Sequence, residues 1–502
     1  MKDERELYSI LLRTYNLWWV SGRIDEVPPY KRSDFYPLLK KLETNLPLLI
    51  VGARQVGKTT LMKQLIEDLL AKKTKPENIL FVDLGDYAIR KNSDDSLLDT
   101  IKVYQQYALK KDFRDVEGIV YLFFDEVQKV KGWNEFTKNI YDAYKGKVKI
   151  ILTGSASLSI LELSEESLAG RYEKQAVVPL KFSEAFRFSR FVKVAKDSKN
   201  DPNLLEKIKK QNQTIRSEQN RLRNSLEEAL KANNPEIFLN ALKEVTINLN
   251  IFEPELVGFL NEYSIKGGYP EIISTPEYER CDRLLQTYIN DIIAKDFLGK
   301  VRKPESLELL LYILGHNTGR KINVDRICAD IEIKKPTYYA YVSALKKICL
   351  IYSLDRLPTS LYGKQSGISK MYINDVGLRN SVIRKFGPLI LTENTGELLE
   401  TLVCDHLLRL SFKWNNYIEP QVYYWTNKND QEVDFVIKTE RFGTPYLPVE
   451  VKSGDSDKIK GIKSFIKEKN SSFGIVVTKN RLEYTPKDKL VYVPLVYFLL
   501  LC

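Results

Sequence analysis

The sequence has 502 residues, which is long for one domain and suggests about three, and its 43% hydrophobic content excludes a wholly disordered chain. Its 77 Lys and Arg against 66 Asp and Glu give a net charge of +11, which favours nucleic acid only modestly over a solvated basic surface. Five scattered cysteines without a C-x-x-C pair, together with only two histidines, argue against a structural zinc site and a disulfide framework.

The start of the chain, residues 1–40, is expected to be a helical lead-in that ends in an aromatic and proline-rich stretch. It lacks the apolar segment of a signal peptide, so we expect a cytoplasmic protein. The apolar residues 492–501 near the other end are too few to span a bilayer and fit a final strand and helix. We therefore expect no membrane partner.

A strand, a phosphate-binding loop and a helix are predicted over residues 46–65, where an apolar run leads into a glycine-rich turn and then into helical spacing. Residues 52–59 match G-x-x-x-x-G-K-[ST] at every fixed position. The predicted nucleotide-binding residues are Gly52, Ala53, Arg54, Gln55, Val56, Gly57, Lys58, Thr59 and Thr60.

Each fixed residue of this loop has a physical task. Gly52 and Gly57 allow the tight turn that brings backbone N–H groups to phosphate oxygens, and the helix N-terminus adds positive potential there. Lys58 would reach the β- and γ-phosphates, and the Thr59 hydroxyl would hold Mg²⁺. The expected cofactors are therefore ATP and Mg²⁺.

Strands and helices alternate after the loop, which predicts a parallel sheet with helices on both faces. The expected strands cover 79–83, 119–125 and 148–153, and the expected helices cover 96–109 and 133–144. The second of these strands ends in Asp125 and Glu126, which would stand beside the phosphate loop. Asp125 would hold Mg²⁺ through water, and Glu126 would orient or deprotonate the attacking water.

Three further polar residues are candidates for contact with the γ-phosphate. Thr153 and Ser155 end the next strand, where they either sense this phosphate or only lead into a turn. Arg171 either stabilises charge during hydrolysis, in cis or from a neighbouring subunit, or forms a structural ion pair. The sequence leaves both alternatives open.

Residues 191–250 change character, because they are rich in Lys, Glu, Gln and Asn and contain no Gly. Leucines at helical spacing predict a charged helical insertion or hairpin that could bind a protein partner. Residues 251–300 return to helices and are expected to form a lid over the nucleotide. The ATPase core would thus occupy 41–190, after the lead-in at 1–40.

Residues 301–365 contain two predicted helices, 322–330 and 336–348, separated by a turn. Residues 350–357 and 370–373 could form a wing, which completes the pattern of a winged helix-turn-helix with its second helix offered to the DNA major groove. The candidate DNA contacts are Lys334, Lys335, Tyr338 and Tyr339. Winged helices also serve in packing or protein contact, so DNA is one of two alternatives.

The last predicted domain, residues 366–502, carries acids and a lysine that could converge. Glu450 and Lys452 are two apart in a predicted strand and therefore share a face, while Asp434 would lie on a neighbouring strand and Glu400 on a helix. Such a group suits phosphodiester hydrolysis, with the acids holding Mg²⁺ and Lys452 acting on the attacking water. The alternative is a domain that keeps this fold without cleaving.

These motifs together resemble a known family. The phosphate loop, the sequence DEVQK at 125–129, LAGR at 168–171 and PLKFSE at 179–184 are similar to the archaeal and bacterial AAA+ ATPases of the AAA_14 type. The C-terminal half resembles the DUF4143 domain that usually accompanies this ATPase and, through it, the PD-(D/E)xK fold. The resemblance implies an α/β chain with a P-loop NTPase (AAA+/ASCE) core, a helical lid, a winged helix-turn-helix and a restriction-endonuclease-like C-terminal domain.

Three functional hypotheses follow. The first is an Mg²⁺-dependent AAA+ ATPase that acts on or near DNA, with hydrolysis moving the C-terminal half relative to the core. The second is a nucleotide-gated switch or scaffold that recruits a protein partner and carries an inactive nuclease-like domain. The third is an ATPase that controls a nuclease. The sequence leaves the oligomeric state open.

Overall fold

The computed structural model describes residues 2–25, 27–90, 96–155, 172–197, 202–297, 304–358, 369–393, 395–414, 421–453 and 459–502. The chain forms two compact units. Unit 1 comprises Met1–Val178, Asp291–Lys300 and Ser343–Cys349, and unit 2 comprises Pro179–Asn290, Val301–Val342 and Leu350–Cys502. Among the described helices, none has both the length and the apolar content that crossing a membrane requires.

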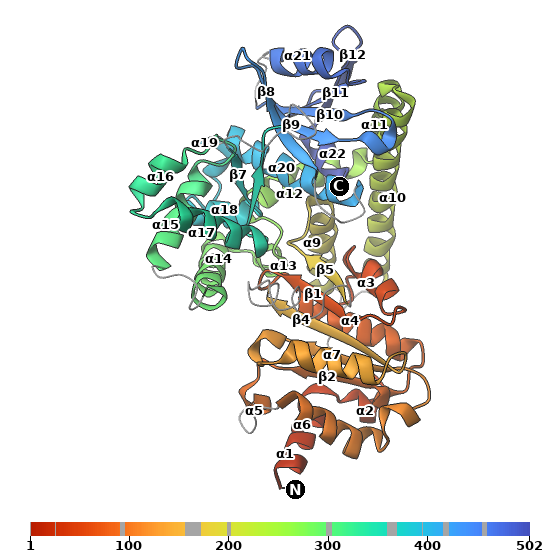
Figure 1. Ribbon diagram of the computed structural model, residues 1–502. Helices are drawn as coiled ribbons and strands as arrows, with labels where there is room; N and C mark the ends of the chain where they lie inside the picture. The colour runs from red at the N-terminus through yellow and green to blue at the C-terminus, as the bar shows by residue number, and fades with distance from the viewer. Residues whose placement is uncertain are drawn as a thin grey trace. The chain divides into compact units, whose positions relative to one another are not determined.

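Unit 1 is built on a five-stranded sheet in the order β2-β3-β4-β1-β5, and all its pairings are parallel (Figure 1). The strands are β1 (Leu48–Gly52), β2 (Ile79–Asp83), β3 (Val120–Asp125), β4 (Val148–Ser155) and β5 (Glu173–Val177). Every residue of β1 is buried, as expected for a strand inside a parallel sheet that is covered on both faces. The predicted alternation of strands and helices is thus confirmed.

Unit 1 contains the helices α1 (Lys2–Ile10), α2 (Trp18–Ser21), α3 (Phe35–Lys41), α4 (Lys58–Ala71), α5 (Tyr87–Arg90), α6 (Ser96–Val103) and α7 (Trp133–Ala143). Among these helices, α4 and α7 agree with the predicted spans to within two residues, and α6 covers the first part of its predicted span. The helix expected at 96–109 continues beyond α6 as a π-helical segment, Tyr104–Leu109.

The N-terminal segment packs on the sheet of unit 1. The Asn16 side chain donates to the Phe81 carbonyl at 3.0 Å and accepts from the Phe81 N–H at 2.7 Å. The indole N–H groups of Trp18 and Trp19 both donate to the Ile79 carbonyl. These bonds cover β2, which would otherwise be an open edge of the sheet. The predicted lead-in is therefore an integral part of this unit.

Unit 2 begins with a series of helices. They are α9 (Phe182–Asp197), α10 (Pro202–Ala232), α11 (Pro235–Asn248), α12 (Glu253–Lys266), α13 (Pro270–Ser274) and α14 (Tyr278–Asp291). The helices α10 and α11 lie side by side as a hairpin (Figure 1). A tight turn joins them, because Asn233 is left-handed and Asn234 caps α11 ahead of Pro235. The expected boundary at 190/191 falls inside α9.

The remainder of unit 2 places helices around two antiparallel strands and a larger sheet. The helices are α15 (Pro304–His316), α16 (Val324–Asp330), α18 (Val376–Val382), α19 (Ile390–Glu393), α20 (Thr395–Trp414), α21 (Lys460–Lys469) and α22 (Leu495–Leu500). Helix α17 (Lys335–Lys347) begins in unit 2, and its residues from Ser343 onward belong to unit 1. The two-stranded sheet pairs β6 (Ile351–Leu354) with β7 (Lys370–Ile373). Two helices and two strands lie at the residues where a winged helix-turn-helix is predicted, and the motif itself stays a prediction.

The C-terminal sheet has six strands in the order β12-β13-β11-β10-β9-β8 and mixes parallel with antiparallel pairs. Its strands are β8 (Val422–Thr426), β9 (Glu432–Lys438), β10 (Tyr446–Val451), β11 (Gly474–Thr478), β12 (Glu483–Thr485) and β13 (Leu490–Pro494). Helix α20 packs against β9 and β10. Helix α20 carries Glu400, β9 carries Asp434 and β10 carries Glu450, while Lys452 directly follows β10 and does not lie, as predicted, within a strand.

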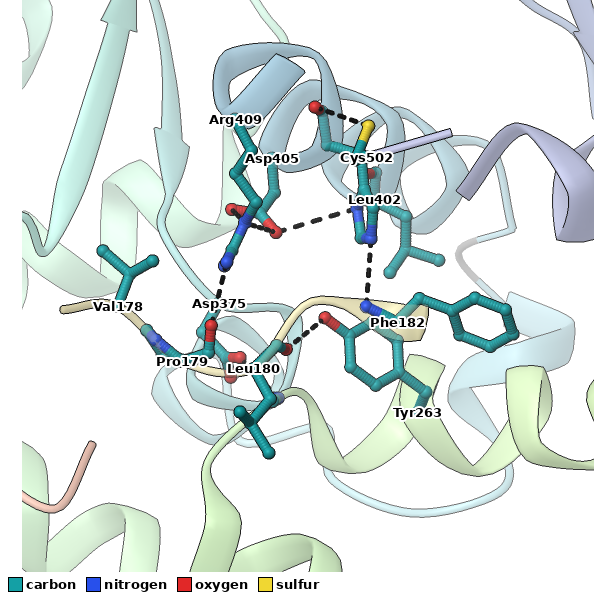
Figure 2. Close-up of polar contacts among 12 residues, drawn as sticks. Val178, Pro179, Leu180, Phe182, Tyr263, Asp375, Leu402, Asp405, Arg409 and Cys502 are labelled. Atoms are coloured by element: carbon teal, nitrogen blue, oxygen red, sulfur yellow. Dashed lines mark hydrogen bonds and ion pairs between the residues drawn. The ribbon is translucent and has the colours of Figure 1, made fainter. Parts of the chain in front are cut away.

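Side chains of α20 also hold the segment with which the chain enters unit 2 (Figure 2). The Arg409 guanidinium donates to the Pro179 carbonyl at 2.9 Å, and the Phe182 N–H donates to Nε2 of His406 at 3.1 Å. The Tyr263 hydroxyl, from α12, donates to the Leu180 carbonyl at 2.9 Å. Asp405 pairs with Arg409 at 2.9 Å. The backbone of this buried segment is thereby bonded to side chains rather than left without partners.

Candidate functional site

The phosphate loop joins the carboxyl end of β1 to the start of α4 in unit 1 (Figure 1). Gly57 has a φ of 97°, a left-handed conformation that favours glycine. At Gly52, an added Cβ would lie 2.1 Å from the carbonyl oxygen of Val177 in β5. Only glycine at this position lets β5 pass so closely. Both fixed glycines of the motif are therefore required by the backbone geometry.

Lys58 and Thr59 open α4, where their side chains make specific contacts. The Lys58 ammonium donates to the carbonyl oxygens of Gly52 at 3.1 Å and Ala53 at 2.9 Å. The Thr59 hydroxyl donates to Oδ2 of Asp125 at 2.6 Å. The other predicted loop residues, Ala53, Arg54, Gln55, Val56 and Thr60, lie in the turn and in the first turn of α4. The two residues predicted to hold Mg²⁺ are thus in direct contact.

Glu126 stands at the end of β3 with a left-handed backbone, φ 55°. Its N–H donates to the Thr153 hydroxyl at 3.2 Å, and its carboxylate accepts from the Gln128 side-chain amide. The Thr153 hydroxyl also bonds to Asp125. Thr153, one of the predicted γ-phosphate contacts, therefore lies against the two carboxylates. The Ser155 side chain and Arg171 fall outside the described residues.

Two residues near the loop were missed by sequence reasoning. The buried Arg32 guanidinium donates to the carbonyls of Val56 at 2.8 Å and Val178 at 2.7 Å, which braces the loop. Asp83 ends β2 directly beside Asp125 in the strand register. Burial raises the pKa of Asp83, and the neighbouring carboxylates of Asp125 and Glu126 add to this rise. Only the order and register of the strands could have revealed Asp83.

In unit 2, the four residues predicted for a nuclease-like site do converge. Asp434 lies on β9 and accepts the Val451 N–H at 2.8 Å, while the Asp434 N–H reaches Glu450 at 3.4 Å. The Lys452 ammonium donates to Oε1 of Glu450 at 2.6 Å. Glu400 comes from α20, and the Tyr372 hydroxyl of β7 donates to its Oε1 at 2.6 Å.

The structure adds residues that the sequence did not suggest to this group. The Lys370 ammonium, from β7, lies 2.6 Å from a Glu432 oxygen and 3.6 Å from a Glu400 oxygen. Lys321 pairs with the same Glu432 at 2.9 Å. We call the four acids Glu400, Glu432, Asp434 and Glu450 the carboxylate cluster. Lys370 and Lys452 form ion pairs with the glutamates of this cluster.

The environment of the cluster disfavours charge on its more buried acids. Burial raises the pKa of Glu400 and of Glu450, and repulsion from Asp434 raises both further. Against the effect of burial, attraction to Lys370 lowers the pKa of Glu432. Within the described part of the chain, no three or more His, Cys, Asp or Glu side chains are arranged to hold a metal ion. Metal binding by Glu400, Asp434 and Glu450 stays a prediction.

The predicted DNA contacts on α16–α17 divide into exposed and buried residues. Lys334, Lys335 and Tyr339 are exposed, and Lys335 pairs with Asp325 at 2.7 Å. Tyr338 is only 1% exposed, so its assignment as a DNA contact is wrong. The buried Val342 lies four positions after Tyr338, about one helical turn, which places both on the inner face of α17.

Family models match three parts of the chain. Residues 44–186 match an AAA domain, the AAA_14 family, and residues 395–498 match a domain of unknown function, DUF4143. The chain carries an AAA-type P-loop ATPase domain and a C-terminal DUF4143 domain. The match to an AAA domain supports nucleotide binding by this part of the chain. A further domain of unknown function, DUF8612, matches residues 258–388 and thus spans both the predicted lid and the predicted winged helix.

Three proteins from two organisms are similar in sequence to this chain. An uncharacterized protein of Methanocaldococcus jannaschii is 24% identical over 404 residues, 79% of this chain and 73% of the relative. A second one from the same organism is 24% identical over 488 residues, covering 94% and 89%. An uncharacterized protein of Haemophilus influenzae is 22% identical over 385 residues, covering 75% and 77%.

Two solved structures give more distant likenesses. The Walker-type ATPase of Pyrococcus abyssi is 16% identical, with a TM-score of 0.39 over 72% of this chain and 97% of that one. AMPPCP-bound DnaA from Aquifex aeolicus is 13% identical, with a TM-score of 0.23 over 62% and 85%.

Proposed function

We propose that the AAA domain of this chain hydrolyses ATP with Mg²⁺. The carrying observation is the 2.6 Å hydrogen bond between the Thr59 hydroxyl and Asp125, with Glu126 next along the chain. Hydroxyl and carboxylate oxygens are ligands that Mg²⁺ prefers, so these two residues fit a magnesium ion. When bound, the ion would neutralise charge on the transferred phosphate.

The roles of the protein side chains follow from their contacts. Lys58 would exchange its two backbone carbonyl partners for phosphate oxygens of ATP, which are stronger acceptors for an ammonium. Glu126 would orient the attacking water or take its proton, with its carboxylate held by Gln128 and its N–H held by Thr153. Arg32 would keep the loop in place through the Val56 carbonyl.

We propose further that hydrolysis is coupled to DNA through the C-terminal half. Lys334 and Tyr339 support this coupling, because they are exposed at the start of α17, where a lysine could contact phosphate and a tyrosine could stack. The net charge of +11 has the sign that DNA attracts. The competing proposal is a nucleotide-gated scaffold, with a protein partner bound through the helices of residues 191–250 and an inactive nuclease-like domain. The buried Lys370 beside Glu400 and Glu432 favours that inactivity.

The test is ATP turnover with and without single- and double-stranded DNA, for wild type, Lys58→Ala and Glu126→Gln. Matched controls on the surface of the same unit are Lys73→Ala and Glu135→Gln, because both residues are exposed. Loss of turnover in the two site variants alone would support hydrolysis at this site, and stimulation by DNA would support coupling. Turnover that survives Glu126→Gln would refute the role of Glu126. Slow turnover that ignores DNA would favour the scaffold.

A further inference from the structure

A buried cation lies beside two acids of the carboxylate cluster in unit 2. Lys370 is 3% exposed, and its ammonium lies between Glu432 at 2.6 Å and Glu400 at 3.6 Å. Asp434 adds to the attraction on the same ammonium. A buried charge is tolerated only when it is paired, so Lys370 and the cluster depend on each other.

Several contacts fix Lys370 in this position. It is the first residue of β7, and its backbone is bridged to Lys321, whose side chain pairs with Glu432. Its ammonium also lies 5.5 Å from the centre of the Tyr424 ring, a cation–π distance. The neighbouring Tyr372, two residues along β7, donates to Glu400. One face of a single strand therefore supplies both a charge and a hydroxyl to the cluster.

Lys370 competes physically with a metal ion. Divalent cations at carboxylates need oxygen ligands directed at one point, whereas the ammonium already lies 2.6 Å from an oxygen of Glu432 and 3.6 Å from an oxygen of Glu400. An added cation would also be repelled by the buried positive charge beside it. The strand β7 lies outside the C-terminal sheet, in the two-stranded sheet with β6.

We propose that Lys370 is the built-in counter-ion of the carboxylate cluster and excludes divalent metal from Glu400 and Asp434. The β6–β7 sheet then acts as an autoinhibitory contact on the nuclease-like site. Any partner that withdraws β7 would uncover acids able to bind a divalent cation. This inference does not depend on ATP hydrolysis.

The test is Mn²⁺ binding to the nucleotide-free full chain, followed by electron paramagnetic resonance, for wild type and Lys370→Met. Methionine keeps the length of the side chain but removes its charge. The variant is expected to bind one more Mn²⁺ per chain than wild type does. Its affinity at the carboxylate cluster should be roughly tenfold or more above any residual affinity of the wild-type cluster. Lys321→Met is the matched control, because it removes a lysine from Glu432 but leaves Lys370 in place, and it should gain no Mn²⁺.

A variant that fails to fold would be replaced by Lys370→Met combined with Glu432→Gln, which removes one charge of each sign. The gained Mn²⁺ should disappear when Asp434→Asn is added, and Mn²⁺ should raise the melting temperature of the lysine variant alone. Wild-type Mn²⁺ binding that Asp434→Asn abolishes would overturn the proposal. So would a folded Lys370→Met chain that gains no Mn²⁺.

Discussion

The two clusters of acids in this molecule satisfy their charges by different means. At the phosphate loop, Asp125 accepts hydrogen bonds from the hydroxyls of Thr59 and Thr153. In the carboxylate cluster, Lys370 and Lys452 donate to the glutamates at 2.6 Å. Neutral donors leave the charge of an acid in place, so Asp125 can still attract a cation, whereas ammonium partners cancel it. Acids of the same type are therefore held by neutral hydroxyl donors at the phosphate loop and by ammonium groups in the carboxylate cluster.

Unit 2 also buries several charged and titratable side chains along a single helix. Helix α20 carries Glu400 toward the carboxylate cluster and, further along, Asp405, His406 and Arg409 toward the entering segment 179–182. Buried pairs of this kind contribute little net stability as a whole, but removing one partner is costly. Substitutions at the phosphate loop should therefore change turnover, while substitutions along α20 should change stability.

The largest effect is expected from Glu126→Gln. An amide cannot take a proton from the attacking water, so kcat should fall about 10²–10⁴-fold while ATP affinity changes little. Lys58→Ala should instead weaken ATP binding itself, because the ammonium partner of the phosphates is lost. Phosphate release and binding of a fluorescent ATP analogue separate the two results. Equal losses of affinity in both variants would contradict the assigned roles.

The next effect is on stability, from Arg409→Met. This change leaves the buried Asp405 carboxylate without its pair and the Pro179 carbonyl without its donor, at a cost of about 3–5 kcal/mol. Urea unfolding followed by tryptophan fluorescence, to which the buried Trp414 on the same helix contributes, measures this loss. Arg409→Lys keeps the charge and should lose less. A loss below that of a typical surface substitution would mean that the pair is dispensable.

A pH dependence follows from His406. Burial, together with the nearby Arg409, lowers the pKa of His406 to about 3 from an ordinary value of 6.5. As pH falls below 6.5 the unfolded chain takes up a proton that the folded chain refuses. The stability from neutral His406 is therefore present above pH 6.5 and is lost toward pH 3, by at most about 1.4 kcal/mol per pH unit.

Comparison with His406→Gln isolates this contribution, because the amide does not titrate. The comparison is needed since acids with raised pKa, such as Asp375 at about 6, change stability in the opposite direction. Urea unfolding at a series of pH values from 7 to 5 should show a wild-type stability that falls relative to the variant. Parallel curves would mean that His406 titrates normally in the folded state.

The nucleotide site was easier to predict from the sequence than the surroundings of the carboxylate cluster. The phosphate loop is contiguous, and Asp125 follows an apolar strand that was recognised by its composition, so the nucleotide site could be assembled from local patterns. Arg32 and Lys370 escaped prediction because they reach their partners only through tertiary packing. No local pattern distinguishes a lysine that neutralises a buried acid from one on the surface.

Tertiary packing also explains why some element boundaries could not be predicted from the sequence. The change of composition near residue 191 suggested a new domain, but α9 continues from Phe182 through this position because its apolar side chains pack into the core of unit 2. On α17, Tyr338 was assigned to the DNA side by its residue type, although helical spacing from Val342 points inward. For Tyr338, helical spacing predicts the orientation of the side chain better than its residue type does.

The smallest expected effects distinguish the two tyrosines of α17. The buried Tyr338 hydroxyl has no hydrogen-bond partner among the described residues, so Tyr338→Phe should leave stability unchanged or raise it by about 1 kcal/mol. Tyr339 is 58% exposed, so Tyr339→Ala should change stability by less than about 0.5 kcal/mol. If α17 contacts DNA, Tyr339→Ala should weaken binding about fivefold through lost stacking, and Tyr338→Phe should not. Fluorescence anisotropy of labelled DNA beside thermal melting tests both, and weaker DNA binding by Tyr338→Phe alone would reverse the orientation assigned to the helix.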